Sequence, residues 1–167
     1  MKTLSWGKCW IYVRKLVSGT ASDKWIKFPI PVEDSTNLTP TKGDKQEATV
    51  EGGEAEAVKY KKNKYALTTQ IRIAPEQPKP LSDDDGVIDG SYEVIVRPEL
   101  EGAIALKIDN ATLSASPEFN TANGIVVEYT ADAVKPSKGN TVKFGTVTVT
   151  GEDTDSETPT FKEIGEE

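Results

Sequence analysis

Histidine, the side chain that most often performs acid–base, triad and metal chemistry, is absent from this sequence. The single cysteine, Cys9, therefore has no imidazole that would activate its thiol, and it cannot form an intrachain disulfide. We interpret Cys9 as a structural residue. These residue types argue against nucleophilic catalysis, so we expect a protein that is not an enzyme and has no catalytic residues.

The string Asp83–Asp84–Asp85–Gly86 is the pattern nearest to a metal-binding loop. An EF-hand calcium loop needs acidic ligands at positions 1, 3 and 5, glycine at position 6 and glutamate at position 12. With Gly86 at position 6, positions 1 and 12 become Leu81 and Tyr92, which supply no carboxylate. We interpret the string as a solvated acidic turn. No glycine pattern has phosphate-loop spacing either, and we expect no metal and no cofactor.

Lysines gather between Lys59 and Lys64, with Tyr60 and Tyr65 beside them. Such a cluster is compatible with a charged hairpin tip that discourages edge pairing, which is the interpretation we favour. Two others stay open: a nucleic-acid platform, and a contact between identical subunits whose acidic loops complement the lysines. The formal net charge of −7 argues against sequence-independent binding to nucleic-acid phosphates.

A long amphipathic strand follows this cluster. Residues of one parity are mostly apolar: Tyr65, Leu67, Thr69, Ile71 and Ile73. This period of two predicts a half-buried strand about 30 Å long. We predict that it is the second arm of a hairpin, with Glu56 to Tyr60 as the first arm and Lys61 to Lys64 as the turn. Gly52–Gly53 is interpreted as a flexible break, and the polar residues 33–46 as a connection.

The first strand, predicted within residues 4–17, has apolar side chains on both faces. It is either central in the core or covered by a neighbouring subunit. Further along the chain, apolar parity changes after Asp109–Asn110, which predicts a bulge. Since strand patterns recur and no long segment has helical periodicity, we predict a mainly β fold, a sandwich or barrel of about 7–9 mostly antiparallel strands with at most one short helix.

Composition divides the chain into a single β-domain, residues 1–150, and an acidic segment, residues 151–167, that we predict to be a flexible tail. Lys8 and Arg14 interrupt the apolar start, so we expect no signal peptide. No run of residues has the length and apolarity needed to span a bilayer, and no membrane partner is expected.

Three segments carry a resemblance to a known family: TVEGGEAEAVKYKKNKYALTTQIRI (49–73), DDGVIDGSYEVIVRPELEG (84–102) and EYTADAVKPSKGNTV (128–142). In the order of these three segments, the chain resembles major tail tube proteins of long-tailed phages, especially prophage versions from gut Bacteroidetes. With the strands between them, these segments cover roughly two-thirds of the chain, and their patterns are loose strand and turn patterns. Proteins of that family share a fold with the tube proteins of contractile injection and type VI secretion systems.

The resemblance implies a tail-tube-like β-sandwich or barrel whose copies close into hexameric rings that stack around a lumen. The implied partners are the protein itself, as a ring or as a monomer before assembly, and other tail proteins, with DNA passing the lumen without specific binding. The implied location is the virion tail, or the host bacterial cytoplasm before assembly. The implied self-assembly residues are those of the loop before the predicted hairpin and of its second arm: Val50, Glu51, Gly52, Gly53, Glu54, Tyr65, Leu67 and Ile71.

Two features depart from the family pattern, namely the lack of a convincing helix and the acidic segment from Gly151. A different class of function also stays open. A monomeric β-sandwich binding module, adhesin-like and directed to a carbohydrate or protein ligand, would have the same composition and strand pattern. Self-assembly is the function that distinguishes the first hypothesis from the second.

Overall fold

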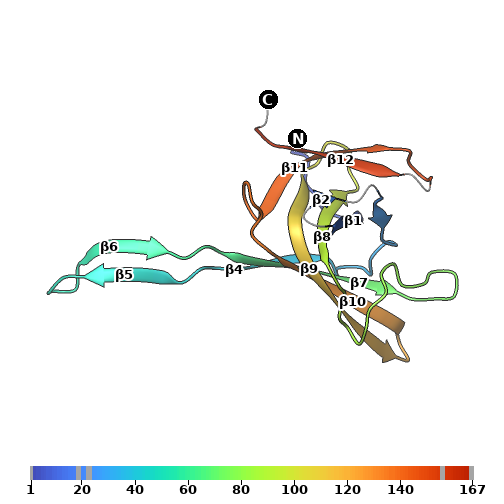
Figure 1. Cartoon of the computed structure of the whole chain (residues 1–167), viewed down its shortest axis with the longest axis horizontal. Helices are drawn as coiled ribbons and strands as arrows, with labels where there is room; N and C mark the ends of the chain where they lie inside the picture. The colour runs from blue at the N-terminus through green and yellow to red at the C-terminus, as the bar shows by residue number, and fades with distance from the viewer. Residues whose placement is uncertain (1, 18–19, 22–23, 155–156, 166–167) are drawn as a thin grey trace.

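A computed structural model describes residues 2–17, 20–21, 24–154 and 157–165. Throughout these ranges the chain is built from β-strands and their connections, and no helix occurs in them. Most strands form one large antiparallel sheet, and two form a separate ribbon that projects from the body (Figure 1). The strands are β1 (Cys9–Val17), β2 (Thr20–Ala21), β3 (Ile26–Lys27), β4 (Asn37–Thr41), β5 (Lys45–Thr49), β6 (Ala55–Tyr60), β7 (Lys64–Arg72), β8 (Ser91–Pro98), β9 (Ala105–Asn120), β10 (Gly124–Ala133), β11 (Val142–Thr150) and β12 (Thr158–Glu163).

The large sheet has the order β2-β1-β8-β9-β10-β7-β4, with β3 paired to β1 and β11 paired to both β9 and β12. The long strand β9 joins its two halves, because its first residues pair with β8 and β11 and its later residues pair with β10. A single buried cluster contains Ile11 and Val13 of β1 together with Leu67 and Ile71 of β7. Strands distant in the sheet order thus face each other across the core, and the described strands form a sandwich-like fold that does not close into a barrel.

The mainly β, antiparallel prediction is therefore confirmed, although the structure has more strands than the predicted 7–9. The additional strands are the two-residue pieces β2 and β3, the exposed strands β4 and β5, which lack an apolar alternation, and β12, which lies in the predicted tail. The predicted bulge at Asp109–Asn110 is confirmed as well. Tyr92 pairs with Ala111 and Val94 with Ile108, so β9 has one more residue than β8 between these pairs.

The alternation in β7 is confirmed by burial. Leu67, Thr69 and Ile71 are 4%, 4% and 0% exposed, while the residues between them are only half-buried. The Thr69 hydroxyl shares a 2.9 Å hydrogen bond with the hydroxyl of Thr36, which satisfies the one polar side chain on this buried face. β7 therefore belongs to the core of the chain itself.

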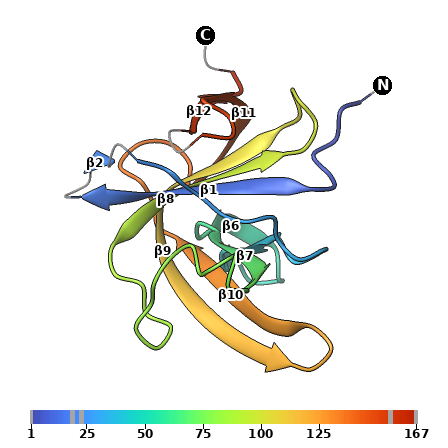
Figure 2. The same ribbon diagram turned by 90° about the vertical axis from the view of Figure 1, so that its right-hand side faces the viewer.

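Strand β1 is covered on both faces. Ile11 and Val13 point into the large core, whereas Tyr12 joins Trp25 and Ile95 in a second cluster on the other face. Side chains from β11 and β12 pack against this second cluster: Val147, Val149 and Phe161. In Figure 2, β11 and β12 lie above β1. Of the two explanations for the two-sided apolar strand, the central position is correct, and the cover comes from the same chain.

The predicted tail is thus wrong for residues 158–163. They form β12 and pair with β11 from Gly145↔Glu163 to Thr150↔Thr158. Acidic composition suggested a solvated segment, but Phe161 packs on the second cluster and Pro159 is buried. A few apolar contacts in register with a neighbouring strand outweigh the composition of the segment as a whole.

The predicted hairpin is also wrong in its turn and in its partner strand. β6 pairs with β5 and β7 pairs with β4, so residues 61–63 lie within the returning side of one long hairpin. The chain reverses at residues 50–54, where the Gly52–Gly53 break was predicted, and residues 37–49 form the outgoing side. Polar strands exposed on both faces carry no periodic signal, because nothing selects apolar residues on either face.

Candidate assembly surface

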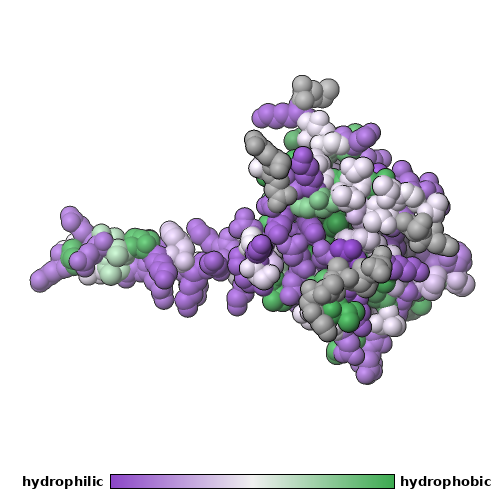
Figure 3. All heavy atoms as spheres, turned by 45° about the horizontal axis from the view of Figure 1, so that its top comes forward, coloured by the Kyte–Doolittle hydropathy of each residue, from purple (hydrophilic) through white to green (hydrophobic). Residues whose placement is uncertain are grey.

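The feature that distinguishes this molecule is an arm, residues 42–64, that projects from the edge of the sheet (Figure 1). Every side chain of β5 and β6 is exposed. Figure 3 shows the arm standing clear of the body, its surface mostly hydrophilic with isolated apolar side chains. The arm contributes no residue to either buried cluster. Its conformation is therefore held mainly by pairing between its own two strands.

Strand pairing is interrupted where the arm leaves the body, because residues 42–44 and 61–63 lie between the β4–β7 pair and the β5–β6 pair. The Lys61 amide donates a 2.8 Å hydrogen bond to the Asp44 carbonyl, and the Gly43 amide donates a 3.0 Å bond to Oδ1 of Asn63. A Cβ on Gly43 would lie 1.8 Å from the Lys61 carbonyl oxygen, so only glycine fits there. The two sides of the hairpin are close together at this point.

The arm tip, residues 50–54, is a tight reversal. The Val50 amide donates to the Glu54 carbonyl at 2.9 Å, and the Gly53 amide donates to the Val50 carbonyl at 3.1 Å. Gly52 and Gly53 have φ angles of 99° and 90°, which other residues rarely adopt. No atom lies within 4 Å of a Cβ built on either glycine, so the tip is open to solvent or to a partner.

The two faces of the arm carry different side chains. On one face, Val58 and Tyr60 are 48% and 52% exposed, and the Lys42 ammonium lies 5.1 Å from the Tyr60 ring centroid. On the other face, Ala48 pairs with Ala57 across the ribbon. An isolated two-stranded ribbon is marginally stable in water and presents two unpaired edges. A ribbon of this kind becomes stable when another surface covers it.

A groove of about 680 Å³, lined by both apolar and polar side chains, lies beside β4 at the base of the arm. It is bounded by the N-terminal segment, the connection before β4 and the first residues of β9, and its apolar lining includes Trp6, Cys9, Ile30, Leu38, Ile104 and Phe144. Trp6 is 70% exposed and Phe144 50%, which is unusual for side chains of this size. The groove is thus a second surface suited to a macromolecular contact.

Cys9 in this groove does not have the environment of a nucleophile. Burial raises the pKa of its thiol, and a hydrogen bond with Thr36 offsets only part of this effect. A raised pKa keeps the sulfur protonated and unreactive at neutral pH. The prediction that Cys9 is structural agrees with its position in contact with the large core.

The predicted assembly residues fall into two groups. Val50, Glu51, Gly52, Gly53 and Glu54 lie together at the exposed arm tip. Leu67 and Ile71, in contrast, are core residues, and Tyr65 is half-buried against the same core. Their side chains hold β7 to the body, so only the first group presents side chains to a partner. Sequence reasoning missed the outgoing strand of the arm and the groove, because neither has an apolar period.

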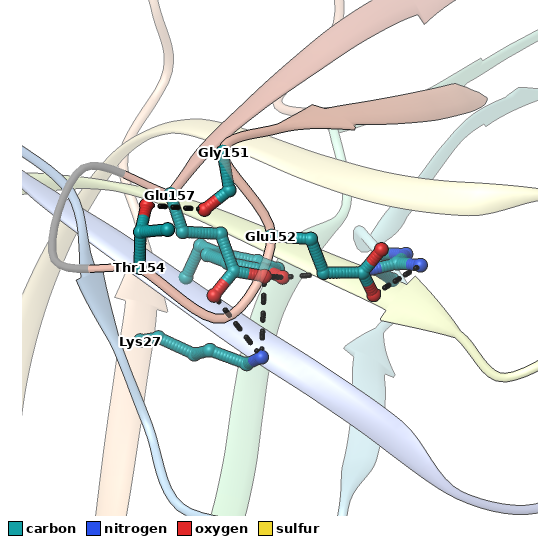
Figure 4. A network of polar contacts seen from close by, with 7 residues as sticks. Lys27, Gly151, Glu152, Thr154 and Glu157 are labelled. Atoms are coloured by element: carbon teal, nitrogen blue, oxygen red, sulfur yellow. Dashed lines mark hydrogen bonds and ion pairs between the residues drawn. The ribbon is translucent and has the colours of Figure 1, made fainter.

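Sequence reasoning also missed a polar cluster beneath the β11–β12 pair (Figure 4). The Tyr12 hydroxyl donates a 2.8 Å hydrogen bond to Oε1 of Glu157, and the Lys27 ammonium lies 3.2 Å from the same carboxylate. Arg97 donates to the Tyr12 hydroxyl at 3.4 Å and contacts Glu152 at 3.7 Å. Burial and the Glu157 carboxylate raise the pKa of Tyr12 to about 12. The cluster ties the loop after β11 to β1.

Charged side chains continue across the same face of the sheet. Glu93, which is 8% exposed, accepts hydrogen bonds from Arg14 at 2.9 and 2.6 Å, and the Lys107 ammonium lies 3.0 Å from its other oxygen. Asp109 follows, in contact with Lys107 at 3.4 Å and with Lys143. Alternating charges of this kind fix the register of β1, β8, β9 and β11, and each buried carboxylate has a partner.

The acidic string folds as the predicted turn. Oδ2 of Asp83 accepts a 2.8 Å hydrogen bond from the Gly86 amide, and Oδ1 lies 3.1 Å from the Lys79 ammonium. These two interactions, the Gly86 amide first, lower the pKa of Asp83. Gly86 has φ of 90°, and an added Cβ would lie 2.7 Å from the Ala115 carbonyl oxygen. Within the described part of the chain, no group of three or more cysteine or acidic side chains could hold a metal ion.

No protein-family model matches the chain, and no curated protein is significantly similar to it. The described ranges contain no helix that has the length and apolarity required to cross a membrane.

Proposed function

We propose that this protein is a structural subunit of a phage-type tail tube that assembles with copies of itself into stacked rings around a lumen for DNA or effector passage. The observation that carries the proposal is the exposed arm. A projecting ribbon that contributes no side chain to the core of its own chain gains stability when a neighbouring molecule covers it. The resemblance to tail tube proteins, and the location of its predicted joining loop at the arm tip, support the same function.

Other properties fit this proposal. The sandwich-like body presents a groove that a neighbouring subunit could cover in addition to the arm. A net charge of −7 disfavours adhesion of DNA phosphates to the lining of a tube. The polar clusters that we describe hold strands in register, which is a structural task. The protein would accordingly act without catalysis, in the virion tail or, before assembly, in the host bacterial cytoplasm.

The experiment is a measurement of mass against concentration by size-exclusion chromatography with light scattering, followed by negative-stain microscopy. We expect species larger than a dimer that grow into rings or tubes as concentration rises. A protein that stays monomeric, or stops at a dimer, at every concentration up to the solubility limit would contradict the proposal.

The role of the arm tip is tested with Gly52→Val and Gly53→Val in one variant. Both φ angles are positive and both Cβ positions are open, so the change alters the tip without a clash inside the molecule. We expect the fold to persist and the assembly to weaken by at least tenfold in concentration. The matched control is Gly102→Val with Gly124→Val, two other glycines with positive φ and open Cβ positions, on the body. Equal assembly of the tip variant and the control variant would show that the tip does not take part in assembly.

The second candidate is a monomeric binding module, adhesin-like, for a carbohydrate or protein ligand. The observation that favours it is the groove with the exposed Trp6 ring, since aromatic side chains in open grooves are common binding surfaces. The mass of the protein in solution distinguishes the two candidates, because a binding module stays monomeric and a tube subunit assembles. A monomer that binds glycans or a protein ligand, and loses this binding on Trp6→Ala, would establish the second function.

A further inference from the structure

We infer that the outer half of the arm, residues 46–58, docks on the arm root, residues 42–45 and 59–64, of a second copy of this chain. The inference rests on the proposed function and identifies the contact through which subunits would join. It is carried by two independent features, the uncovered faces of the β5–β6 ribbon and the separation of charge along it.

Charge along the arm is divided into two blocks of opposite sign. The outer half contains four glutamates, Glu47, Glu51, Glu54 and Glu56, and neither lysine nor arginine, a formal charge of −4. The root contains one aspartate and six lysines, Lys42, Lys45, Lys59, Lys61, Lys62 and Lys64, a formal charge of +5. All of these side chains are exposed. A ribbon with separated charge is complementary to a second ribbon displaced along its length.

The charges are not neutralised within the molecule. Lys45 and Glu47, which meet at the boundary of the two blocks, form a 3.1 Å ion pair. Among the described residues, no ion pair involves Glu51, Glu54 or Glu56, nor Lys59, Lys61 or Lys62. Both blocks therefore keep their charge for an external partner. Complementary charges of this kind fix register and accelerate encounter more than they add affinity.

The ribbon offers a surface on which a second copy can lie. One face presents the small pair Ala48–Ala57 beside the Lys59 side chain of the root, and the opposite face presents Val58 and Tyr60. The centres of the two blocks, near Lys61 and Glu54, are seven residues apart, which corresponds to a displacement of about 23 Å at 3.3 Å per residue. The contact joins different surfaces of the two copies, so each added subunit leaves an outer half and a root for the next.

A second copy fits these features better than nucleic acid does. A polyanion would be attracted to the root but repelled by the four glutamates beyond it and by a chain whose net charge is −7. Copies of the arm match both blocks, one copy on the outer half and another on the root. Nucleic acid is accordingly an outcome of the test below.

The test uses charge reversal and mixing. One variant of the full chain has Glu51→Lys, Glu54→Lys and Glu56→Lys, and the other has Lys59→Glu, Lys61→Glu and Lys62→Glu. Each alone should require at least tenfold higher concentration to assemble, because like charges meet. An equimolar mixture should assemble near the wild-type concentration, because each reversed block finds a complement on the other variant. Circular dichroism verifies that both variants are folded.

Matched controls change the same charge on the body. They are Glu76→Lys with Glu101→Lys and Glu118→Lys, and Lys2→Glu with Lys138→Glu and Lys162→Glu, all exposed residues. We expect these controls to assemble like the wild type. If wild type and all variants assemble equally, the arm contact is wrong while the proposed function stands. If the wild type itself never assembles, both are wrong. Failure of the mixture, with heparin binding that depends on the root lysines, would assign the root to a polyanion and overturn the inference.

Discussion

Tyr12 of β1 combines a fully buried ring with a hydroxyl that makes a polar contact. Its ring lies in the second cluster, while its hydroxyl reaches the Glu157 carboxylate beside Lys27. A fully buried tyrosine is tolerated when its hydroxyl finds an acceptor. A carboxylate is likewise tolerated at low exposure when it is paired. The Tyr12 hydroxyl and the Glu157 carboxylate therefore satisfy each other's hydrogen bonding, and this contact helps to position the β11–β12 pair.

We expect Tyr12 to ionise near pH 12, above the ordinary pKa of 10.0, because burial and the neighbouring carboxylate disfavour the phenolate. The folded state thus favours the neutral phenol. Its contribution to stability is complete below pH 10 and is lost as pH rises through about 12. Absorbance of the phenolate during alkaline titration measures the pKa, and Tyr12→Phe should remove the last-titrating group. Ionisation of every tyrosine by pH 11 would contradict this expectation.

At the scale of elements, the β11–β12 pair acts as a cover for one face of the sheet. Phe161 packs on the cluster of Tyr12, Trp25 and Ile95, and the Lys107 ammonium lies 5.7 Å from its ring centroid. The pair also continues the sheet from β9. An element predicted as a solvated tail is therefore part of the stable body.

Phe161→Ala should destabilise the protein by about 1–3 kcal/mol, less than a fully buried phenylalanine because this side chain is only half-buried. Chemical denaturation followed by tryptophan fluorescence measures the change. Phe119→Ala is the control, since Phe119 is 70% exposed and should alter stability by less than about 0.5 kcal/mol. Equal effects of the two substitutions would show that β12 does not cover the cluster.

Prediction from sequence succeeded for strands that turn one apolar face to the core. It failed for strands that are exposed on both faces and for contacts between residues far apart in the chain. The alternation from Tyr65 to Ile71 specifies β7, and the parity change at Asp109–Asn110 specifies the bulge. β5 and the outgoing side of the arm have no apolar face, so no period marks them. The Tyr12–Glu157 contact joins residues 145 positions apart, which no local pattern reveals.

The whole molecule combines a self-sufficient body with an appendage. The body contains both buried clusters, whereas the arm contains neither. The candidate site was predicted in part, because the Gly52–Gly53 break identified the tip. The shape of the arm and the groove at its base depend on strand pairing that only the three-dimensional structure reveals.

Replacing residues 42–63 by Asn-Gly, a pair suited to a tight hairpin turn between Thr41 and Lys64, should leave the body intact. We expect the free energy of unfolding to change by less than about 1 kcal/mol, since no core contact is removed. Assembly should be lost at all concentrations that support it in the wild type. Calorimetry and light scattering on the same samples measure both quantities. Retained assembly would show that the groove, and not the arm, joins the subunits.

The cover of β1 by β11 and β12 has a consequence for the order of events during synthesis. Domains generally fold as units during synthesis, and β1 leaves the ribosome more than a hundred residues before its cover. Until residues 142–163 follow, the face with Trp25 and Ile95 stays open to water. The nascent chain thus carries an apolar face that has no cover yet. The body can therefore be completed only after translation has passed its last strands.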